Sequence, residues 1–270
     1  MPTAKLSTRG LSKSFRKGSM TVEVLRGLDV DIFPGEFVSI VGASGCGKTT
    51  FLRLVDGLIG PTAGSVLIDG EAIHKPDARM AFVFQQDGLL PWRTVTNNAA
   101  LGPEIQRRDK GEARRIADQY LRLVGLAGFS RHYPHELSGG MRQRVNIARA
   151  LSAGADVLLM DEPFAALDAQ TREIMQAELL RIWNETRKTV LLVTHQIDEA
   201  VYLSDRVLIF TARPGRLKQE LSIDLPRPRQ LAVKRTPEFV RYTDTIWRAI
   251  EEEVRESIGR EAEEIAASHS

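Results

Sequence analysis

The architecture of this chain follows from one continuous run, Phe37-Val-Ser-Ile-Val-Gly-Ala-Ser-Gly-Cys-Gly-Lys-Thr-Thr-Phe-Leu-Arg-Leu-Val55. The run opens with β-type apolar residues, passes through a glycine cluster and continues with helix formers, which predicts a strand, a loop and a helix. Residues 42–49 fit the pattern G-x-x-x-x-G-K-[ST], in which backbone N–H groups and a helix N-terminus face phosphate oxygens. A chance glycine loop would not need to stand between a strand and a helix. The run therefore predicts an α/β nucleotide-binding fold.

The predicted loop contacts phosphate through its main chain and its side chains. Lys48 would neutralise the β and γ phosphates of a nucleotide, and the Thr49 hydroxyl would hold Mg²⁺. Cys46 is expected to contribute its N–H group. Its thiol is a predicted chemical handle, because a bulky thiol reagent should abolish the nucleotide-dependent activity unless bound nucleotide protects the loop. The predicted nucleotide contacts in the loop are Gly42, Ala43, Ser44, Gly45, Cys46, Gly47, Lys48, Thr49 and Thr50.

A second apolar run ends in two carboxylates, Val157-Leu-Leu-Met-Asp-Glu162. Ligands of parallel sheets bind at the carboxyl ends of the strands, which is where Asp161 and Glu162 would lie. Beside a phosphate-binding loop, Asp161 is expected to support Mg²⁺ and Glu162 to polarise the attacking water. Without that loop, a solvated acidic turn would be the better explanation.

Composition and charge restrict the class of protein. The chain has 270 residues, 43% of them hydrophobic and 27% charged, which excludes disorder throughout and suits one large α/β domain or two smaller ones. Its formal net charge of +2 gives no electrostatic basis for binding nucleic acid. The apolar runs are too short for a membrane helix. A single cysteine and a start without an apolar leader predict a reducing, cytoplasmic setting.

The remaining periodicities predict a helical block between strands. Residues 110–124 repeat apolar side chains every three or four positions, and a second helix should follow Ser138 and run through Leu151. Strands on both sides of this block indicate an α/β core with a helical insertion. The predicted strands lie around residues 27–31, 37–41, 65–69, 80–84, 157–160, 189–193 and 206–210.

The chain changes character after Phe210. Arg213-Pro-Gly-Arg216 and Pro226-Arg-Pro-Arg229 are rich in turn formers, which predicts an arm or linker. From about Pro237 the sequence predicts a helix packed by one face. That helix would carry Phe239, Ile246, Ile250, Val254 and Ile258.

The segment Leu137-Ser-Gly-Gly-Met141 predicts another helix start that suits an anion. Ser138 can cap the following helix, while Gly139 and Gly140 leave their N–H groups unobstructed. Taken alone, an ordinary capped turn would explain this segment better.

Taken in order, these motifs resemble those of the ATP-binding subunits of ABC transporters, over roughly residues 5 to 215. Walker A corresponds to residues 42–49, Walker B to the pair Asp161-Glu162, and Leu137-Ser-Gly-Gly140 is similar to the family signature. Three more motifs complete the resemblance: Phe82-Val-Phe-Gln85 as the Q-loop, Ala166-Leu-Asp168 as the D-loop and Val193-Thr-His195 as the switch histidine. The resemblance implies a P-loop ABC ATPase core with an inserted α-helical subdomain and a small antiparallel β subdomain.

The resemblance also implies an ATPase that works as a homodimer with ATP and Mg²⁺. In that family two subunits pack head to tail, and each ATP lies between the P-loop of one and the signature of the other. Ser138, Gly139 and Gly140 would therefore serve the nucleotide of the partner copy, and Asp168 would cross the interface.

Three further roles are implied by position in the family pattern. Gln85 would approach Mg²⁺ and the attacking water, and the His195 imidazole would stabilise the γ-phosphate. Phe15 stands where the family places an aromatic ring on the adenine, with ordinary core packing as the alternative. A lone histidine such as His195 would otherwise be structural or solvated.

The segment Gln86-Asp-Gly-Leu-Leu-Pro-Trp-Arg-Thr-Val95 concerns what the ATPase energises. In ABC importers this region belongs to the groove that receives a helix of the membrane subunit. An exposed Trp92 would suit that contact, whereas a Trp completing the core of the helical subdomain is the alternative. This segment, with residues 212–216 and 224–229, is similar to importers of the nitrate, sulfonate and taurine group.

The resulting prediction is an ATP-hydrolysing importer subunit, peripheral at the cytoplasmic face of the membrane. Its partners would be a second copy, a transmembrane permease and, indirectly, a periplasmic or extracellular solute-binding protein. The predicted boundaries are 1–215 for the ABC domain, about 87–155 for its helical subdomain and 216–270 for the arm and helix. An importer of another small solute, such as a pyrimidine-type vitamin precursor, and a soluble non-transport ABC ATPase are the alternatives. A P-loop kinase would leave Ser138 and His195 unexplained.

Overall fold

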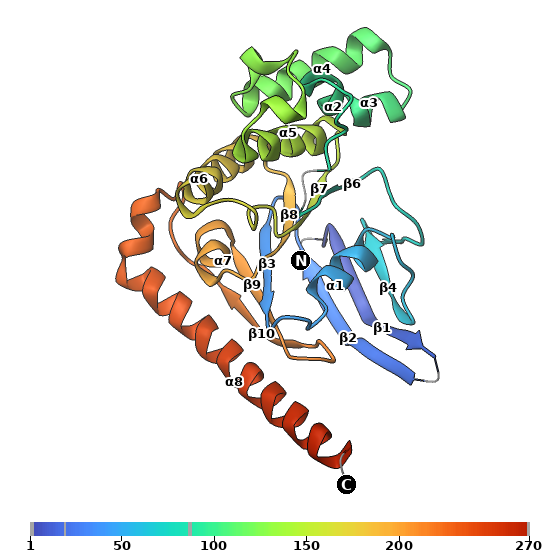
Figure 1. Ribbon diagram of the computed structural model, residues 1–270, viewed down its shortest axis with the longest axis vertical. Helices are drawn as coiled ribbons and strands as arrows, with labels where there is room; N and C mark the ends of the chain where they lie inside the picture. Colours follow the sequence, from blue (N-terminus) through green and yellow to red (C-terminus); the bar gives the residue numbers. More distant parts are fainter. Residues whose placement is uncertain (1–2, 19, 86–87, 269–270) are drawn as a thin grey trace. The chain divides into compact units, whose positions relative to one another are not determined.

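The computed structural model describes residues 3–18, 20–85 and 88–268 (Figure 1). The chain divides into two compact units. The first unit is Met1–Lys75 together with Leu192–Ser270, and the second is Pro76–Leu191. Gln86 and Asp87, which open the predicted permease-facing segment, lie outside the described residues.

The first unit contains an antiparallel sheet in the order β2-β1-β4-β5. Strand β1 (Leu6–Lys17) pairs with β2 (Met20–Ile32) and with β4 (Ala63–Ile68), and β4 also pairs with β5 (Glu71–Ala72). Alternate residues of β2, such as Leu28, Val30 and Ile32, are buried, which is typical of a sheet with one covered face. This sheet is the small antiparallel β subdomain that the resemblance implied.

The first unit also contains the strand that leads into the glycine loop. Strand β3 (Phe37–Gly42) lies parallel to β9 (Arg206–Phe210), with Gly42 opposite Phe210, and β10 (Leu217–Ser222) pairs antiparallel with β9. Every residue of β3 is buried. Such continuous burial is what parallel strands covered on both faces require. Helix α1 (Lys48–Val55) follows the loop, as predicted.

The second unit contains β6 (Met80–Val83), which runs parallel to β7 (Val157–Asp161), and β7 neighbours β8 (Thr189–Val193). Its helices confirm the predicted helical block, since helices are found at 110–123 and directly after Ser138. The buried face of α4 carries Ala113, Ala117 and Leu121, at the predicted spacing. The helices of this unit are α2 (Val95–Ala99), α3 (Leu101–Ile105), α4 (Lys110–Leu123), α5 (Gly139–Ser152) and α6 (Ala169–Thr186).

The C-terminal part of the first unit is helical, with α7 (Ile197–Leu203) and α8 (Pro237–Ser268) in contact (Figure 1). Phe239 and Ile246 are buried, as predicted for the packed face of α8, but Val254 is 38% exposed. The prediction for Val254 is wrong because the preceding Glu253 takes the inward position. Its carboxylate accepts from the Ala212 N–H at 2.9 Å and pairs with Lys218 at 3.0 Å.

All the predicted strands are found within a residue or two of their expected bounds, apart from β2, which begins earlier at Met20. Among the described residues, no helix is both long enough and apolar enough to cross a bilayer.

Candidate functional site

The glycine-rich loop joins β3 to α1 in a backbone path that glycine permits. Gly47 precedes α1 with φ of 102°, which side-chain-bearing residues rarely adopt. A Cβ atom at this position would also lie 2.6 Å from Leu25 Cδ2. The backbone angle and this contact both disfavour a residue with a side chain at position 47. The loop is therefore built so that its amide groups lie at the start of α1.

Lys48 brings a cation into the centre of this loop. Its side chain is buried, and Nζ donates to the carbonyl oxygens of Gly42 at 2.9 Å and Ala43 at 3.0 Å. The positive end of the α1 dipole adds to the same field. Backbone amides, a helix N-terminus and an ammonium group together make a site for anionic oxygens.

Cys46 lies in the same loop with little access to solvent. It is 1% exposed, and burial raises the pKa of its thiol. A buried, protonated thiol reacts slowly, because the thiolate is the nucleophile. The Cys46 side chain points inward, where its Sγ would lie 3.1 Å from a Cβ placed on Gly42. The predicted reactivity stays a prediction, and this burial argues for slow labelling of the folded chain.

The turn Arg213-Pro-Gly-Arg216, predicted as part of an arm, packs directly on the loop. The Arg213 guanidinium donates to the Gly45 carbonyl at 3.2 Å. Gly215 is buried, and its N–H donates to the Val24 carbonyl at 2.8 Å. The pattern Arg213-Pro-Gly-Arg216 indicated a turn but carried no signal for what the turn would contact.

Phe15 projects from β1 with 43% of its surface exposed. The Nζ of Lys13 lies 5.0 Å from the centre of its ring. This exposure excludes the alternative that Phe15 is an ordinary core residue. An accessible ring beside a cation can receive a planar, anionic ligand.

Hydrogen bonds of its neighbours Thr194 and Gln196 fix the backbone on both sides of His195. Thr194, which precedes it, is buried, and its N–H donates to Ile40 of β3 at 3.2 Å. The Thr194 hydroxyl donates to the buried carboxylate of Glu199 and accepts from the Gln196 N–H at 3.0 Å. His195 itself is exposed. The imidazole is therefore presented from a short, hydrogen-bonded segment that ends in α7.

In the second unit, the parallel strands β6 and β7 bring three predicted residues to one sheet edge. Asp161 is the last residue of β7, Glu162 follows it, and Gln85 lies two residues beyond β6. Asp161 is only 9% exposed. Glu162 has φ of 46°, in the left-handed region, where a side-chain-bearing residue is strained. Such strain is concentrated at functional sites.

The signature segment begins α5 as predicted. Ser138 is the N-cap residue, and its hydroxyl accepts from the Met141 N–H at 3.3 Å. Gly140 is packed closely, since a Cβ there would lie 3.0 Å from Thr171 Cγ2. A hollow of about 430 Å³ in this unit is lined by Gln85, Gly139, Arg142, Gln143, Pro163, Ala165, Ala166 and Leu167. The structure therefore places the Q-loop glutamine, the signature and the D-loop around one hollow.

Asp168 has a local role that the motif did not reveal. Its carboxylate caps α6 by accepting from the Thr171 N–H at 3.0 Å, and this hydrogen bond lowers the pKa of the Asp168 carboxyl. Arg172 donates to the Leu167 carbonyl at 2.7 Å and so braces the same loop. The capping position could have been found from the sequence, because Asp168 precedes a helix-forming run.

Trp92 is 72% exposed, which rejects the alternative that it completes the core of the helical block. The loop that carries Trp92 is fixed by hydrogen bonds to the buried side chain of Asn98. The Asn98 carboxamide accepts from the Leu90 N–H at 2.8 Å and donates to the carbonyls of Leu90, Arg93 and Thr94 at 3.1, 3.0 and 3.1 Å. An indole held outward on a braced loop is suited to contact another protein.

Comparisons with known proteins agree with this geometry. The family model described as ABC transporter matches residues 25–165. The nitrate import ATP-binding protein of Synechocystis is 43% identical over 97% of this chain and 98% of its own length. An aliphatic sulfonates import ATP-binding protein of Bacillus cereus is 45% identical over 83% of this chain and 88% of its own length.

A solved structure carries the same fold. It is a dimeric ATP-binding cassette in a post-hydrolysis state bound to ADP and Pi, with a TM-score of 0.71 and 33% identity, covering 82% of this chain and 100% of the other. The family match covers the glycine loop, the segment Leu137–Gly140 and the paired carboxylates Asp161 and Glu162. The chain thus belongs to the ABC transporter family, as an ATP-binding subunit that hydrolyses ATP.

Proposed function

We propose that this subunit powers the import of a small solute, of the nitrate, sulfonate and taurine type, through a separate permease. One observation carries the proposal: the likeness to a nitrate import subunit extends over 97% of this chain, including the arm and α8 beyond the family model. The likeness to a sulfonate import subunit supports the same class of solute. Nitrate and sulfonates share a compact, oxygen-rich anionic group.

Within the catalytic site, we assign the phosphate contacts to Lys48 and the loop amides, and the adenine to the exposed ring of Phe15. Thr49, Gln85 and Asp161 would hold Mg²⁺. Their hydroxyl, amide and carboxylate oxygens are the donors this ion prefers, which is why the set fits it. Bound Mg²⁺ would neutralise charge on the β and γ phosphates.

Hydrolysis itself would use two further side chains. Glu162 would accept a proton from the attacking water, and His195 would donate a hydrogen bond to the γ-phosphate. The left-handed backbone of Glu162 supports its assignment, because it turns the chain sharply at the end of β7. The exposure of His195 on a hydrogen-bonded segment supports the second assignment.

The working unit would be a head-to-tail homodimer. Ser138, Gly139 and Gly140 would bind the γ-phosphate held by the partner copy, and Asp168 would lie at the contact. The dimeric state of the cassette with ADP and Pi supports this arrangement. The Ser138 hydroxyl, which accepts from Met141 at the start of α5, still has its own proton to donate.

Transport would require proteins outside this chain. A permease would contact the loop that carries Trp92, and a periplasmic or extracellular solute-binding protein would select the solute. The subunit would then sit peripherally at the cytoplasmic face of the membrane. We assign the ABC domain to residues 1–215, its helical subdomain to about 87–155, and the arm and helix to 216–270.

Reconstitution tests the solute class. The chain is purified with the permease and the solute-binding protein of its transport system and placed in vesicles. ATP hydrolysis is then measured with nitrate, an alkanesulfonate, taurine or a neutral sugar. We expect one of the three anionic or zwitterionic solutes to stimulate hydrolysis and the sugar to have no effect. The Glu162→Gln variant is the control for hydrolysis by other enzymes. Stimulation by the sugar alone would overturn the proposal.

A further inference from the structure

Arg229 is a buried cation in a segment that composition marks as an exposed arm. It is 6% exposed, and burial lowers the pKa of its guanidinium to about 10, so the group stays charged at neutral pH. The pKa is lowered further by the neighbouring charge of Arg227. A buried charge is costly unless its donors are all used.

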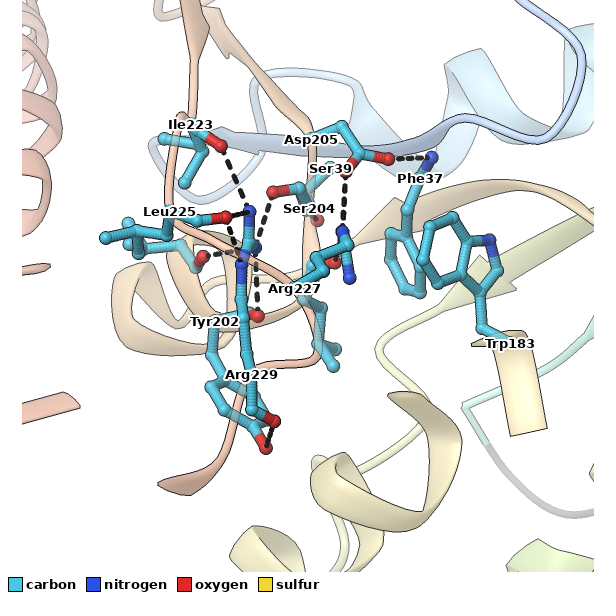
Figure 2. Close-up of polar contacts among 12 residues, drawn as sticks. Phe37, Ser39, Trp183, Tyr202, Ser204, Asp205, Ile223, Leu225, Arg227 and Arg229 are labelled. Carbon is cyan, nitrogen blue, oxygen red and sulfur yellow. Dashed lines mark hydrogen bonds and ion pairs between the residues drawn. The ribbon is translucent and has the colours of Figure 1, made fainter. Parts of the chain in front are cut away.

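The Arg229 donors are all used, and their acceptors are main-chain carbonyls (Figure 2). Nη1 donates to Val201 at 3.1 Å, to Tyr202 at 3.1 Å and to Ser204 at 2.7 Å. Nη2 donates to Ile223 at 3.0 Å and to Leu225 at 3.2 Å, and Nε also reaches Leu225 at 3.3 Å. One side chain therefore ties together two segments of the first unit.

The first of these segments is the end of α7. The last carbonyls of a helix have no partner within the helix, and a cation at that end is also favoured by the helix dipole. Val201 and Tyr202 lie in the last turn of α7, and Ser204 is its C-cap. The guanidinium of Arg229 thus closes the carboxyl end of α7 by hydrogen bonds to the groups the helix leaves open.

Arg227 completes this closure. Its Nη2 donates to the Leu203 carbonyl at 2.7 Å, and its Nε donates to the Asp205 carboxylate at 2.8 Å. The other oxygen of Asp205 accepts from the Phe37 N–H at 2.9 Å, at the start of β3 (Figure 2). The two arginines of Pro226-Arg-Pro-Arg229 therefore fasten the end of α7 and connect it to the strand that leads into the glycine loop.

The opposite end of α7 begins directly after His195. Gln196 is the N-cap, its carbonyl accepts from the Ala200 N–H at 3.1 Å, and Glu199 of the first turn accepts from Thr194. The helix has only seven residues. A shift at its carboxyl end is therefore transmitted to the segment that presents His195, because a single short helix joins the two.

We propose that Arg229 is a positioning residue for His195, which sets the imidazole for its action on the γ-phosphate by anchoring the carboxyl end of α7. The inference rests on the role of His195 proposed above. It gives the arm a part in hydrolysis.

The test compares Arg229→Met, which keeps much of the side-chain volume and removes every donor, with Arg229→Lys, which keeps the charge but has three donors on one atom. Arg235→Met is the matched control, because Arg235 is an exposed arginine on the same arm. Each full-length variant is titrated with a fluorescent ATP analogue to count binding-competent sites. Hydrolysis is then measured per competent site, and the imidazole resonances of the five histidines are recorded by NMR.

We expect Arg229→Met to lower kcat per competent site by roughly tenfold or more while KM for ATP changes less than twofold, since a small misplacement of a reacting group is costly. The resonance of His195, assigned with His195→Ala, should move while the other four stay. Arg229→Lys should lie between this variant and the wild type, and Arg235→Met should match the wild type.

Wild-type kcat per competent site in Arg229→Met, or an unmoved His195 resonance, would overturn the inference. If Arg229→Met does not fold, the same two readouts on Arg229→Lys decide it. A wild-type kcat in His195→Ala would instead refute the proposed role of His195. That result is distinct from a failure of positioning, which the resonance reports independently.

Discussion

Gly215 faces the main chain of Cys46 so closely that a Cβ atom on it would lie 2.2 Å from the Cys46 carbonyl oxygen. The same Cβ would stand 3.0 Å from Leu25 Cδ2. The turn around Gly215 therefore packs against the phosphate-binding loop. The contact is between the main chain at Gly215 and the main chain at Cys46.

Gly215→Ala should accordingly weaken nucleotide binding. A carbonyl oxygen cannot give way as a flexible side chain can, so the loop must shift, and overpacking of this kind costs about 1–3 kcal/mol. Titration with a fluorescent ATP analogue should show at least a fivefold loss of affinity. Gly60→Ala is the control, because nothing lies within 4 Å of a Cβ at Gly60. Equal affinities in the two variants would contradict this account of the turn.

Glu162→Gln should separate binding from turnover. The amide keeps the size of the side chain but cannot accept the proton of water, so hydrolysis should fall by about 100-fold or more, in line with the loss of a general base. ATP should still bind and should hold the chain as a dimer, which light scattering after gel filtration measures. Normal turnover in this variant would show that another group activates the water.

Asp56, the C-cap of α1, should make stability depend on pH in an unusual direction. Burial raises the pKa of its carboxyl from 3.8 to about 6, so between these values the unfolded chain ionises first and the folded state loses stability as the pH rises. Below pH 4 the group contributes nothing, and above pH 6 the whole penalty is present. Asp56→Asn should therefore raise the free energy of unfolding at pH 8 by about 1–3 kcal/mol.

Urea unfolding at pH 4, 6 and 8 measures this effect, with the exposed Asp224→Asn as the control. The gain from Asp56→Asn should shrink as the pH falls towards 4. A gain that does not change with pH would mean that the amide is favoured for reasons other than charge.

Cys46 should resist thiol reagents in the folded protein. Its burial and raised thiol pKa predict labelling by a disulfide reagent that is slower than in denatured protein by about 100-fold or more. Absorbance of the released thiolate gives both rates. Fast labelling of the folded chain, at a rate that ATP slows, would confirm the chemical handle that the sequence alone predicted.

Trp92→Ala should weaken binding to the permease without disturbing the fold. The indole is 72% exposed, so its loss should change the free energy of unfolding by less than about 0.5 kcal/mol. Co-purification with the permease should fall at least tenfold, as expected for an aromatic interface anchor. Ile105→Ala is matched to it, being 72% exposed in the same unit. An equal loss in both variants would place the contact elsewhere.

Local signals were enough to predict much of this fold. The cap at Ser138 and the periodicity of residues 110–124 lie within single helices, so neighbouring residues determine them. The glycine loop is similar, because the pattern itself specifies a strand, a turn and a helix start. In each of these features, residues close together in the sequence determine the local structure.

Features that depend on contacts between residues far apart in the sequence could not be predicted. Arg229 stands in a charged, proline-rich stretch that is typical of a solvated arm, yet its acceptors begin at Val201, 28 positions away. Glu253 displaced Val254 from the packed face of α8 for a similar reason, since its partner Ala212 lies 41 positions away.

The left-handed backbone of Glu162 implies a compromise between the stability of the fold and the activity of the protein. A residue with a side chain costs roughly 1–2 kcal/mol more than glycine in this region, so a glycine would be the more stable occupant of the position after β7. The chain keeps a carboxylate there at the expense of its own stability. Searches for more stable variants of this protein should therefore leave Glu162 unchanged, because a stabilising glycine would remove the group that we propose activates water.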